Sequence, residues 1–280
     1  MGERKEERTP AGEAFGQEEL ERRMAAETVW AGHPVKFYDS VDSTNLRAIQ
    51  EAENGAPEGT LVVADVQTAG RGRRGRSWQS PAGVNAYFTL LLRPDYKPER
   101  ASMVTLVMAL AVAEGIEAAC GLRARIKWPN DIVVNGRKVC GILTEMRAER
   151  DSVRHVVVGA GINVGLQAFA PELADKAVSL QAECGFRIPR AFLIARVMKA
   201  FEARYGTFRE TLDLSGLRET YDGLLVNRDR EVCVLDPAGA FAGTARGIND
   251  RGELLVELPG GSLVTVYAGE VSVRGTDGYV

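Results

Sequence analysis

Several residue types are scarce in this chain, and each scarcity argues against a class of chemistry. The two histidines, His33 and His155, lie far apart, so a histidine-based triad or metal cluster is not expected. The four cysteines are widely spaced and form no C-x-x-C pair, which indicates free thiols in a reducing compartment. The chain has neither an export signal nor the run of about 20 apolar residues that a membrane span needs. We therefore expect a cytoplasmic protein with no membrane partner.

The composition is that of an ordinary globular protein with one or two domains. The chain has 280 residues, of which 45% are hydrophobic and 26% are charged. Its net charge of −3 does not favour a protein built mainly to hold nucleic acid. Any anion site must therefore come from a local cluster of basic residues, and residues 70–76 form the densest one.

The apolar periodicity predicts an α+β fold in three parts. Residues 1–34 are expected to be a partly disordered extension, residues 35–226 an α+β domain and residues 227–280 a small β-barrel. The predicted elements are helices over 17–30, 99–120 and 190–212 and strands over 60–67, 85–94 and 153–165. Asn135-Gly136 predicts a hairpin, since both residues tolerate positive φ. The sheet is thus expected to be mixed, mainly hairpin-connected and packed with helices.

The segment AGRGRRGRSW, residues 69–78, has a G-x-G-x-x-G spacing but lacks the context of a dinucleotide turn. Pro81 and Gly83 follow before a helix could develop. The alternative of a solvated basic turn remains open. Four neighbouring arginines repel one another unless an anion relieves them, and flexible glycines expose backbone N–H groups beside the guanidiniums. With Trp78 as a stacking surface, the loop favours an anionic, nucleotide-like ligand.

Two further segments carry polar side chains suited to a ligand. KWPND, residues 127–131, offers an ammonium, an amide and a carboxylate where the predicted hairpin begins, and Lys138 begins the returning strand. Lys127 and Lys138 could therefore face one anion, although a strand entry capped by Asn130 and Asp131 is an equal alternative. DSTN, residues 42–45, is a helix N-cap signature that could equally bind a small polar group.

Taken together and in this order, SVDSTN, VQTAGRGRRGRSW, KWPNDI, RKVCGILTE and GAGINV closely resemble the biotin protein ligases, over about residues 35–280. The resemblance implies a catalytic domain like that of class II aminoacyl-tRNA synthetases and a C-terminal SH3-like β-barrel. It also implies that biotin and MgATP form biotinyl-5′-AMP and pyrophosphate, and that biotin then passes to one lysine of biotin carboxyl carrier protein. Such chemistry needs cations rather than a histidine base.

The same resemblance implies the roles of individual residues. Arg73, Lys127 and Lys138 would be catalytic. The biotin site would comprise Ser43, Thr44, Asn45, Gln67, Gly70, Arg71, Gly72, Arg73, Lys138 and Gly141. The ATP and adenylate site would comprise Arg71, Arg73, Arg76, Trp78, Lys127, Asn130, Asp131 and Asn163, with Asp131 as a candidate Mg²⁺ ligand. Loop 70–76 would close over the water-sensitive adenylate.

Some relatives also carry an N-terminal winged-helix domain and act as repressors. The 34 residues before the matching region are too few for that domain, so we expect a ligase that does not bind DNA. A homodimer is possible, since dimers are common in the family. Two alternatives stand beside this prediction: a lipoate-type protein ligase of the same fold, and a nucleic-acid-binding module that uses the arginine loop.

Overall fold

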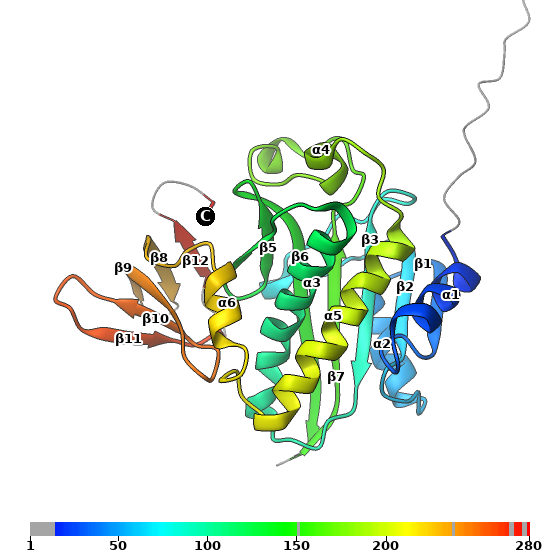
Figure 1. The fold of residues 1–280 in the computed structure, drawn as a ribbon, viewed down its shortest axis with the longest axis horizontal. Coiled ribbons are helices and arrows are strands. Elements are labelled where there is room, and N and C mark those ends of the chain that lie inside the picture. The colour runs from blue at the N-terminus through cyan, green and yellow to red at the C-terminus, as the bar shows by residue number, and fades with distance from the viewer. Residues whose placement is uncertain (1–14, 150–151, 237–238, 269–271, 276–278) are drawn as a thin grey trace, which may run out of the picture.

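A seven-stranded mixed sheet forms the centre of the larger part of the protein (Figure 1). The computed structural model describes residues 15–149, 152–236, 239–268, 272–275 and 279–280. The strand order is β1-β2-β3-β7-β6-β5-β4, in which β1 and β2 are parallel and the other neighbours are antiparallel. The strands are β1 (Val35–Val41), β2 (Leu61–Gln67), β3 (Ala86–Leu92), β4 (Arg125–Lys127), β5 (Asp131–Val134), β6 (Arg137–Glu149) and β7 (Ser152–Ile162).

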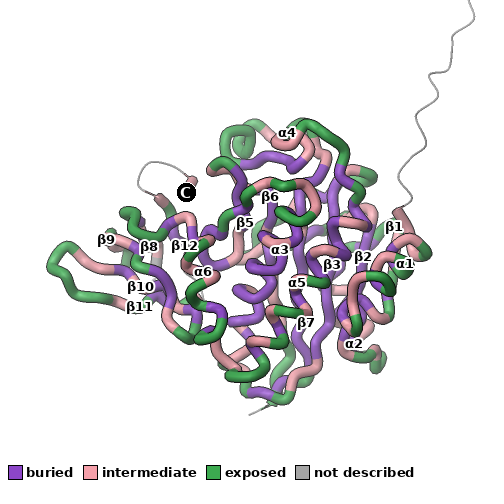
Figure 2. The backbone as a smooth tube through the Cα atoms, in the orientation of Figure 1, coloured by how far each residue is buried: buried purple, intermediate pink, exposed green. Residues whose placement is uncertain are grey.

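The two faces of this sheet bury two different sets of alternate residues, as the period of two in a strand requires. Leu61, Leu90 and Val158 belong to the main core, against which α3 (Val104–Cys120) and α5 (Arg190–Thr211) pack. Val62 and Leu91 point the other way and meet α2 (Thr44–Glu53), which forms the crossover between the parallel strands. The buried strands and α3 are visible as the interior of Figure 2.

The long apolar helix of the core is also the one stretch of the described residues with the length and hydropathy to cross a membrane. Its 3-10 beginning η2 (Pro98–Met103) and α3 together span Pro98–Cys120, and 67% of the most apolar window is buried inside the protein. Its contacts with α5 and the sheet are those of a core helix (Figure 1).

The segment after Phe15 is built into this core rather than set apart from it. Helix α1 (Gln17–Glu27) buries Leu20 and Met24 completely and packs on α5. Beyond the helix, the Glu202 carboxylate of α5 accepts hydrogen bonds from three consecutive backbone N–H groups, those of residues 29–31. The predicted extension over residues 1–34 is therefore part of the core in this stretch, while its first 14 residues lie outside the described residues.

A separate five-stranded antiparallel sheet follows at the β4 end of the large sheet (Figure 1). Its order is β11-β10-β9-β8-β12, with β8 (Glu231–Asp236), β9 (Gly239–Ile248), β10 (Leu254–Glu257), β11 (Leu263–Val266) and β12 (Ser272–Gly275). Helix α6 (Arg218–Leu224) joins the two parts and contacts both β4 and β9. The expected α+β class with a small all-β C-terminal unit is confirmed, and the boundary at 226/227 stays a prediction.

Most predicted elements are confirmed, with shifts at their ends. The helix predicted over 17–30 stops at Glu27, because Thr28 is extended. The hairpin turn at Asn135-Gly136 has the two positive φ angles that its sequence predicts, 48° and 77°. Strand β1 and the short helix α4 (Leu180–Cys184) were not predicted as elements.

Candidate functional site

A cavity of about 880 Å³ opens on the α2 face of the large sheet, and it collects nearly all of the residues predicted from the motifs. They come from the N-terminus of α2, the end of β2, the loop 70–76, the β4–β5–β6 hairpins and the end of β7. Gly70 is the exception and lies outside the lining: a Cβ there would overlap the Trp78 carbonyl oxygen, so Gly70 allows the chain to return beside itself. The spatial grouping follows from the fold, whereas the individual roles stay predictions.

Ser43, Thr44 and Asn45, at the N-terminus of α2, form a buried polar floor of the cavity. The helix is not capped in the way that its sequence predicts. Ser43 precedes the helix, and its side chain makes no capping hydrogen bond. Instead, the Gln67 side-chain oxygen accepts a hydrogen bond from the Thr44 backbone N–H at 2.9 Å. A residue at the end of β2 thus satisfies the helix terminus, and the Ser43 hydroxyl stays available to a ligand.

Asn45 fixes this floor to two more strands. Its amide donates to the Leu143 carbonyl oxygen at 3.1 Å and to Glu145 at 2.9 Å, while its oxygen accepts from the Thr89 hydroxyl at 2.7 Å. Asn45 is 4% exposed and Thr89 is fully buried. Such a satisfied buried network holds its members in one geometry, which is what a small polar ligand requires.

Two glycines of GAGINV leave the space into which neighbouring side chains fit. A Cβ on Gly159 would overlap the Asn45 side-chain oxygen. A Cβ on Gly161 would lie 2.5 Å from the Trp78 indole nitrogen, so the indole packs directly against the strand backbone. The Trp78 N–H is buried and has no hydrogen-bond acceptor within the described part of the chain, which marks a place for a ligand oxygen.

The replacement Gly159→Ala is expected to destabilise the protein by about 1–3 kcal/mol, because the new methyl group displaces Asn45. It should also weaken binding of the biotin that the sequence resemblance implies. Chemical denaturation and titration calorimetry measure the two effects. The matched control is Gly206→Ala in α5, where nothing lies within 4 Å of the new Cβ and alanine is the better helix former. If Gly159→Ala is as stable as the parent and binds biotin normally, the close approach of Asn45 to Gly159 contributes to neither stability nor binding.

The arginine-glycine loop folds back on itself as a narrow turn. Residues Arg71 and Ser77 form an isolated bridge, and the Gly72 N–H donates to the Arg76 carbonyl oxygen at 2.8 Å. Positive φ angles at Arg74 and Gly75, 59° and 70°, reverse the chain. No helix opens after Gly75, in agreement with the rejection of a dinucleotide turn.

Two arginines of the loop tie it to opposite walls of the cavity. Arg71 forms an ion pair of 3.2 Å with Glu145, next to the polar floor. The Arg73 guanidinium donates to the Asn130 side-chain oxygen and to the Ala268 carbonyl oxygen, both at 2.8 Å. Arg73 therefore connects the loop with KWPND and with the C-terminal sheet, a link that the sequence did not predict.

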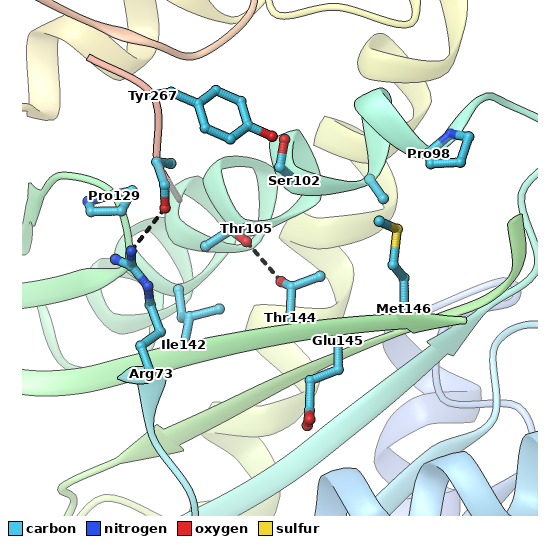
Figure 3. A pocket seen from close by; sticks show the side chains of 12 residues that line it. Arg73, Pro98, Ser102, Thr105, Pro129, Ile142, Thr144, Glu145, Met146 and Tyr267 are labelled. Atoms are coloured by element: carbon cyan, nitrogen blue, oxygen red, sulfur yellow. Dashed lines mark hydrogen bonds between the residues drawn. The ribbon is translucent and has the colours of Figure 1, made fainter. Parts of the chain in front are cut away.

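A smaller cavity of about 270 Å³ adjoins the first one at Arg73 (Figure 3). It lies on the α3 side of β6, where the Thr105 hydroxyl donates to the Thr144 hydroxyl at 2.8 Å. Figure 3 shows Arg73 pointing from its loop past Pro129, with Tyr267 of the C-terminal part on the far side. Arg73 thus stands at the junction of the two spaces.

Lys127 and Lys138 both line the cavity, and both interact electrostatically with the Asp131 carboxylate. The Lys138 ammonium lies 2.5 Å from Asp131 Oδ1, and the Asn130 amide lies 3.1 Å from the same oxygen. Lys127 ends β4 and is 6% exposed. Next to it, the buried indole N–H of Trp128 donates to the Gly252 carbonyl oxygen at 2.9 Å and holds this corner against the C-terminal sheet.

Burial and neighbouring charge shift the pKa values in this cluster in opposite directions. Burial lowers the pKa of Lys127 to about 8, although the Asp131 carboxylate opposes this effect. Burial alone raises the pKa of Asp131, but the Lys138 ammonium and its hydrogen bond outweigh it and hold the pKa below the ordinary value. At neutral pH the cluster therefore carries two cations and one anion.

The lowered pKa of Lys127 predicts a pH dependence. From about pH 8 to the ordinary lysine value of 10.5, Lys127 loses its proton in the folded chain but keeps it in the unfolded one. Its contribution to stability therefore rises with pH in this window, while its attraction for phosphate falls. For ATP, the phosphate ligand that the sequence resemblance implies, the KM is expected to increase above pH 8 in initial-rate assays. Lys127→Met should remove that increase. An identical pH profile in the variant would assign the titration to another group.

Some residues of the cavity wall belong to no motif. The connection after β7, which contains the 3-10 turn η3 (Pro171–Leu173), lies beside the hairpin because the Lys138 N–H donates to the Lys176 carbonyl oxygen at 2.7 Å. It contributes Phe169, the one aromatic residue between β7 and α4, and this is the one sequence signal that the connection carries. The other wall residues outside the motifs are Gln79, Leu166, Glu172, Leu173, Lys176, Ala177, Val273, Arg274 and Tyr279. Ile142, Leu143, Gly159, Ala160 and Gly161 also line the wall and lie within motifs, but they had no predicted role.

The hydrogen-bond donors of the cavity fit a phosphate ligand. A metal ion would be held there partly by the phosphate itself. The two lysines and the unpartnered Trp78 N–H are donors suited to phosphate or carboxylate oxygens. In the described ranges, no three His, Cys, Asp or Glu side chains form a metal cage. Mg²⁺ is commonly bound by one or two carboxylates together with substrate phosphates, and Asp131 would be such a carboxylate, with Glu172 the other acidic residue in the lining.

Comparison with known families places both parts of the chain. Residues 37–163 match the Biotin/lipoate A/B protein ligase family, and residues 229–274 match the Biotin protein ligase C terminal domain. The first match includes every motif from DSTN to GAGIN, and the second covers most of the antiparallel C-terminal sheet.

Individual proteins agree with the family matches. The bifunctional ligase/repressor BirA of Bacillus subtilis is 41% identical over 257 residues, which cover 91% of this chain and 78% of that protein. The biotin–[acetyl-CoA-carboxylase] ligase of Paracoccus denitrificans is 36% identical over 242 residues, which cover 84% of this chain and 98% of that protein. The structure of biotin protein ligase from Aquifex aeolicus in complex with biotin and ATP superposes with a TM-score of 0.75, at 30% identity, over 86% of this chain and 99% of that one.

Proposed function

Because this chain belongs to the biotin/lipoate A/B protein ligase family, we propose that it is a biotin–[biotin carboxyl carrier protein] ligase. It would form biotinyl-5′-AMP from biotin and MgATP and pass the biotinyl group to one lysine of the carrier. That the protein is a biotin ligase follows from its family membership. The carrier and the residue roles are the proposal.

One observation supports this function above the others. A single cavity places a buried polar floor at Ser43–Asn45 next to the paired cations Lys127 and Lys138, with the loop 70–76 tied to its walls. A neutral polar pocket beside a cationic one is what a ligand with a polar ring and a carboxylate needs when the carboxylate must meet a phosphate. The Aquifex aeolicus ligase was solved with biotin and ATP, which supports the same pair of ligands here.

The polar floor would bind the ring system of biotin. Ser43, Thr44 and Gln67 present hydroxyl and amide groups, and Asn45 is held from behind by Thr89 and Glu145. The biotin carboxylate would then point toward Lys138, since Lys138 and Gly141 lie farther along the same cavity. This arrangement orients the carboxylate without a nucleophilic side chain.

The cation cluster would carry the adenylation step. A carboxylate oxygen of biotin forms a bond to the α-phosphorus while the bond to the β-phosphate oxygen breaks, so that pyrophosphate leaves. Lys127 and Lys138 would neutralise charge on the transferring phosphoryl group, and Mg²⁺ when bound would supply further charge neutralisation. Arg71, Arg73 and Arg76 of the loop would then hold the mixed anhydride until the amine of a carrier lysine attacks its carbonyl carbon and AMP leaves.

Ligand choice and carrier transfer test this proposal together. Titration calorimetry should give biotin binding at least tenfold tighter than lipoate binding. With biotin and MgATP, a biotin carboxyl carrier domain should gain the mass of one biotinyl group at one lysine, and Lys→Arg at that carrier position should abolish the gain. Tighter binding of lipoate, or transfer of lipoate to the matching carrier, would replace the proposal with a lipoate-type ligase. Tight DNA or RNA binding at physiological salt, without any transfer, would favour the nucleic-acid alternative.

A further inference from the structure

Among the described residues after β12, Tyr279 reaches the centre of the cation cluster, which consists of Lys127, Asp131 and Lys138. Its hydroxyl donates to Asp131 Oδ2 at 2.5 Å. Its ring lies under the Lys127 ammonium, with the nitrogen 3.5 Å from the ring centroid. No motif of the sequence includes Tyr279, and the proposed reaction gives it no role.

With Tyr279 in this position, the charged groups of the cluster are occupied by one another. Asp131 accepts from Tyr279 through one oxygen, while its other oxygen contacts Lys138 at 2.5 Å. Lys127 is left 6% exposed, and the tyrosine ring faces its ammonium. A phosphate oxygen that accepts a hydrogen bond from Lys127 must come within about 2.7–2.9 Å of the same nitrogen.

The ring and a phosphate group therefore compete for one place. Lys127 is 6% exposed as a residue, and the face of the Tyr279 ring lies 3.5 Å from its nitrogen, so the ring and a phosphate oxygen approach the same ammonium group. The phenolic hydroxyl likewise occupies the carboxylate oxygen of Asp131 that faces away from Lys138. Tyr279 thus occupies the Lys127 ammonium and the Asp131 carboxylate, the two groups that a metal-bound triphosphate would need.

We infer that Tyr279 is an internal competitor of the nucleotide: its side chain fills the phosphate position and must leave before ATP binds. The inference rests on the proposed function, because it takes the Lys127–Lys138 cluster as the phosphate site. Tyr279 is thus a residue that sets the affinity for ATP without touching the biotin floor. Its displacement is favourable once ATP is present, since a charge-assisted bond to phosphate is stronger than a cation–π contact.

The inference predicts tighter nucleotide binding when the side chain is removed. In the parent, ATP must break the cation–π contact and one hydrogen bond of Tyr279 before it binds. Tyr279→Ala removes this cost, so the Kd for a non-hydrolysable ATP analogue should fall by roughly 3- to 30-fold. Tyr279→Phe keeps the ring but loses the bond to Asp131, so its Kd should fall between those of the parent and Tyr279→Ala. The Kd for biotin should be the same in all three proteins.

The experiment is titration calorimetry of the full chain with α,β-methylene-ATP and Mg²⁺, after saturation with biotin. Tyr38→Phe is the matched control, because Tyr38 also bonds a carboxylate, Glu51 at 2.8 Å, and lies 5.0 Å from a cationic group, that of Arg47, but in β1 and away from the cluster. This control should bind the analogue like the parent.

Three results would overturn the inference or its basis, and they can be told apart. Unchanged analogue binding in Tyr279→Ala would mean that the side chain does not hold the phosphate position. Weaker binding would make Tyr279 a part of the nucleotide site rather than its competitor. If the parent itself neither binds the analogue nor exchanges pyrophosphate, the proposed function fails, whatever the variants do.

Discussion

Replacing Lys138 with alanine is expected to lower the rate of biotinyl-adenylate formation by roughly 10- to 150-fold. That range corresponds to about 1.5–3 kcal/mol for one hydrogen bond to a charged group. The effect has two sources, since the variant loses a cation and also releases the Asp131 carboxylate from its partner at 2.5 Å. An unpaired carboxylate next to Lys127 repels the incoming triphosphate and takes up part of the remaining positive charge.

Single-turnover production of biotinyl-AMP measures this prediction. The control is Lys199→Ala, which removes another lysine paired with a carboxylate, Glu27 at 3.0 Å, on the surface of α5 and far from the cavity. It should form the adenylate at the parent rate. A Lys138→Ala rate within twofold of the parent would contradict the assignment of Lys138 to the adenylation step.

The replacement Arg73→Gly is expected to leave adenylate formation largely intact and to speed release of the adenylate by about 10- to 100-fold. The side chain makes two hydrogen bonds of 2.8 Å that join the loop 70–76 to Asn130 and to the Ala268 carbonyl oxygen. Without them the loop loses its connection to the C-terminal part and no longer retains the mixed anhydride. The released anhydride should label lysines of unrelated proteins.

Mass spectrometry of a bystander protein in the reaction, together with a chase of labelled adenylate, gives both quantities. Arg74→Gly is the matched control: it removes a neighbouring arginine of the same loop at a φ of 59°, which glycine adopts without strain. It should keep the label on the carrier. If Arg73→Gly also labels the carrier alone, retention of the adenylate does not depend on Arg73.

The candidate site was largely predictable because its residues cluster in short motifs. DSTN, the arginine-glycine loop and KWPND each contain several polar residues within a few positions, and the Asn135-Gly136 turn predicts that Lys127 and Lys138 face the same region. The fold brings the motifs together in one cavity because α2 and the loop lie on one face of the sheet. The α+β class followed from the long apolar helices and the β-rich tail.

The contacts between motifs could not be predicted from local sequence. The ion pair of Arg71 with Glu145 joins residues far apart in the sequence, and the bond from Arg73 to the Ala268 carbonyl oxygen joins the loop 70–76 to the segment after β11. Every residue has a backbone carbonyl oxygen, so residue type cannot indicate which one accepts a hydrogen bond. Likewise, Ser43 has the sequence of a helix cap, but Gln67 supplies the acceptor, because tertiary packing placed a second oxygen nearer.

Parts of the wall that lack a motif were missed for the same reason. Phe169 is the one aromatic residue of the connection between β7 and α4, and Tyr279 lies beyond the last predicted strand. Each reaches the cavity through the path of the chain rather than through a local pattern. The parallel pairing of β1 with β2 was also missed, because the polar residues of β1 interrupt the alternation of apolar and polar positions that would indicate a strand.

Exchange of labelled pyrophosphate into ATP is the most direct measurement of the central claim, that the cavity joins a biotin carboxylate to the α-phosphate of ATP. The exchange requires reversible formation of an enzyme-bound acyl-adenylate and no carrier protein. The account predicts exchange that depends on biotin, does not occur with lipoate in its place, and falls by roughly 10-fold or more in Lys138→Ala. Exchange that proceeds without biotin, or no exchange when biotin and MgATP are both present, would contradict it.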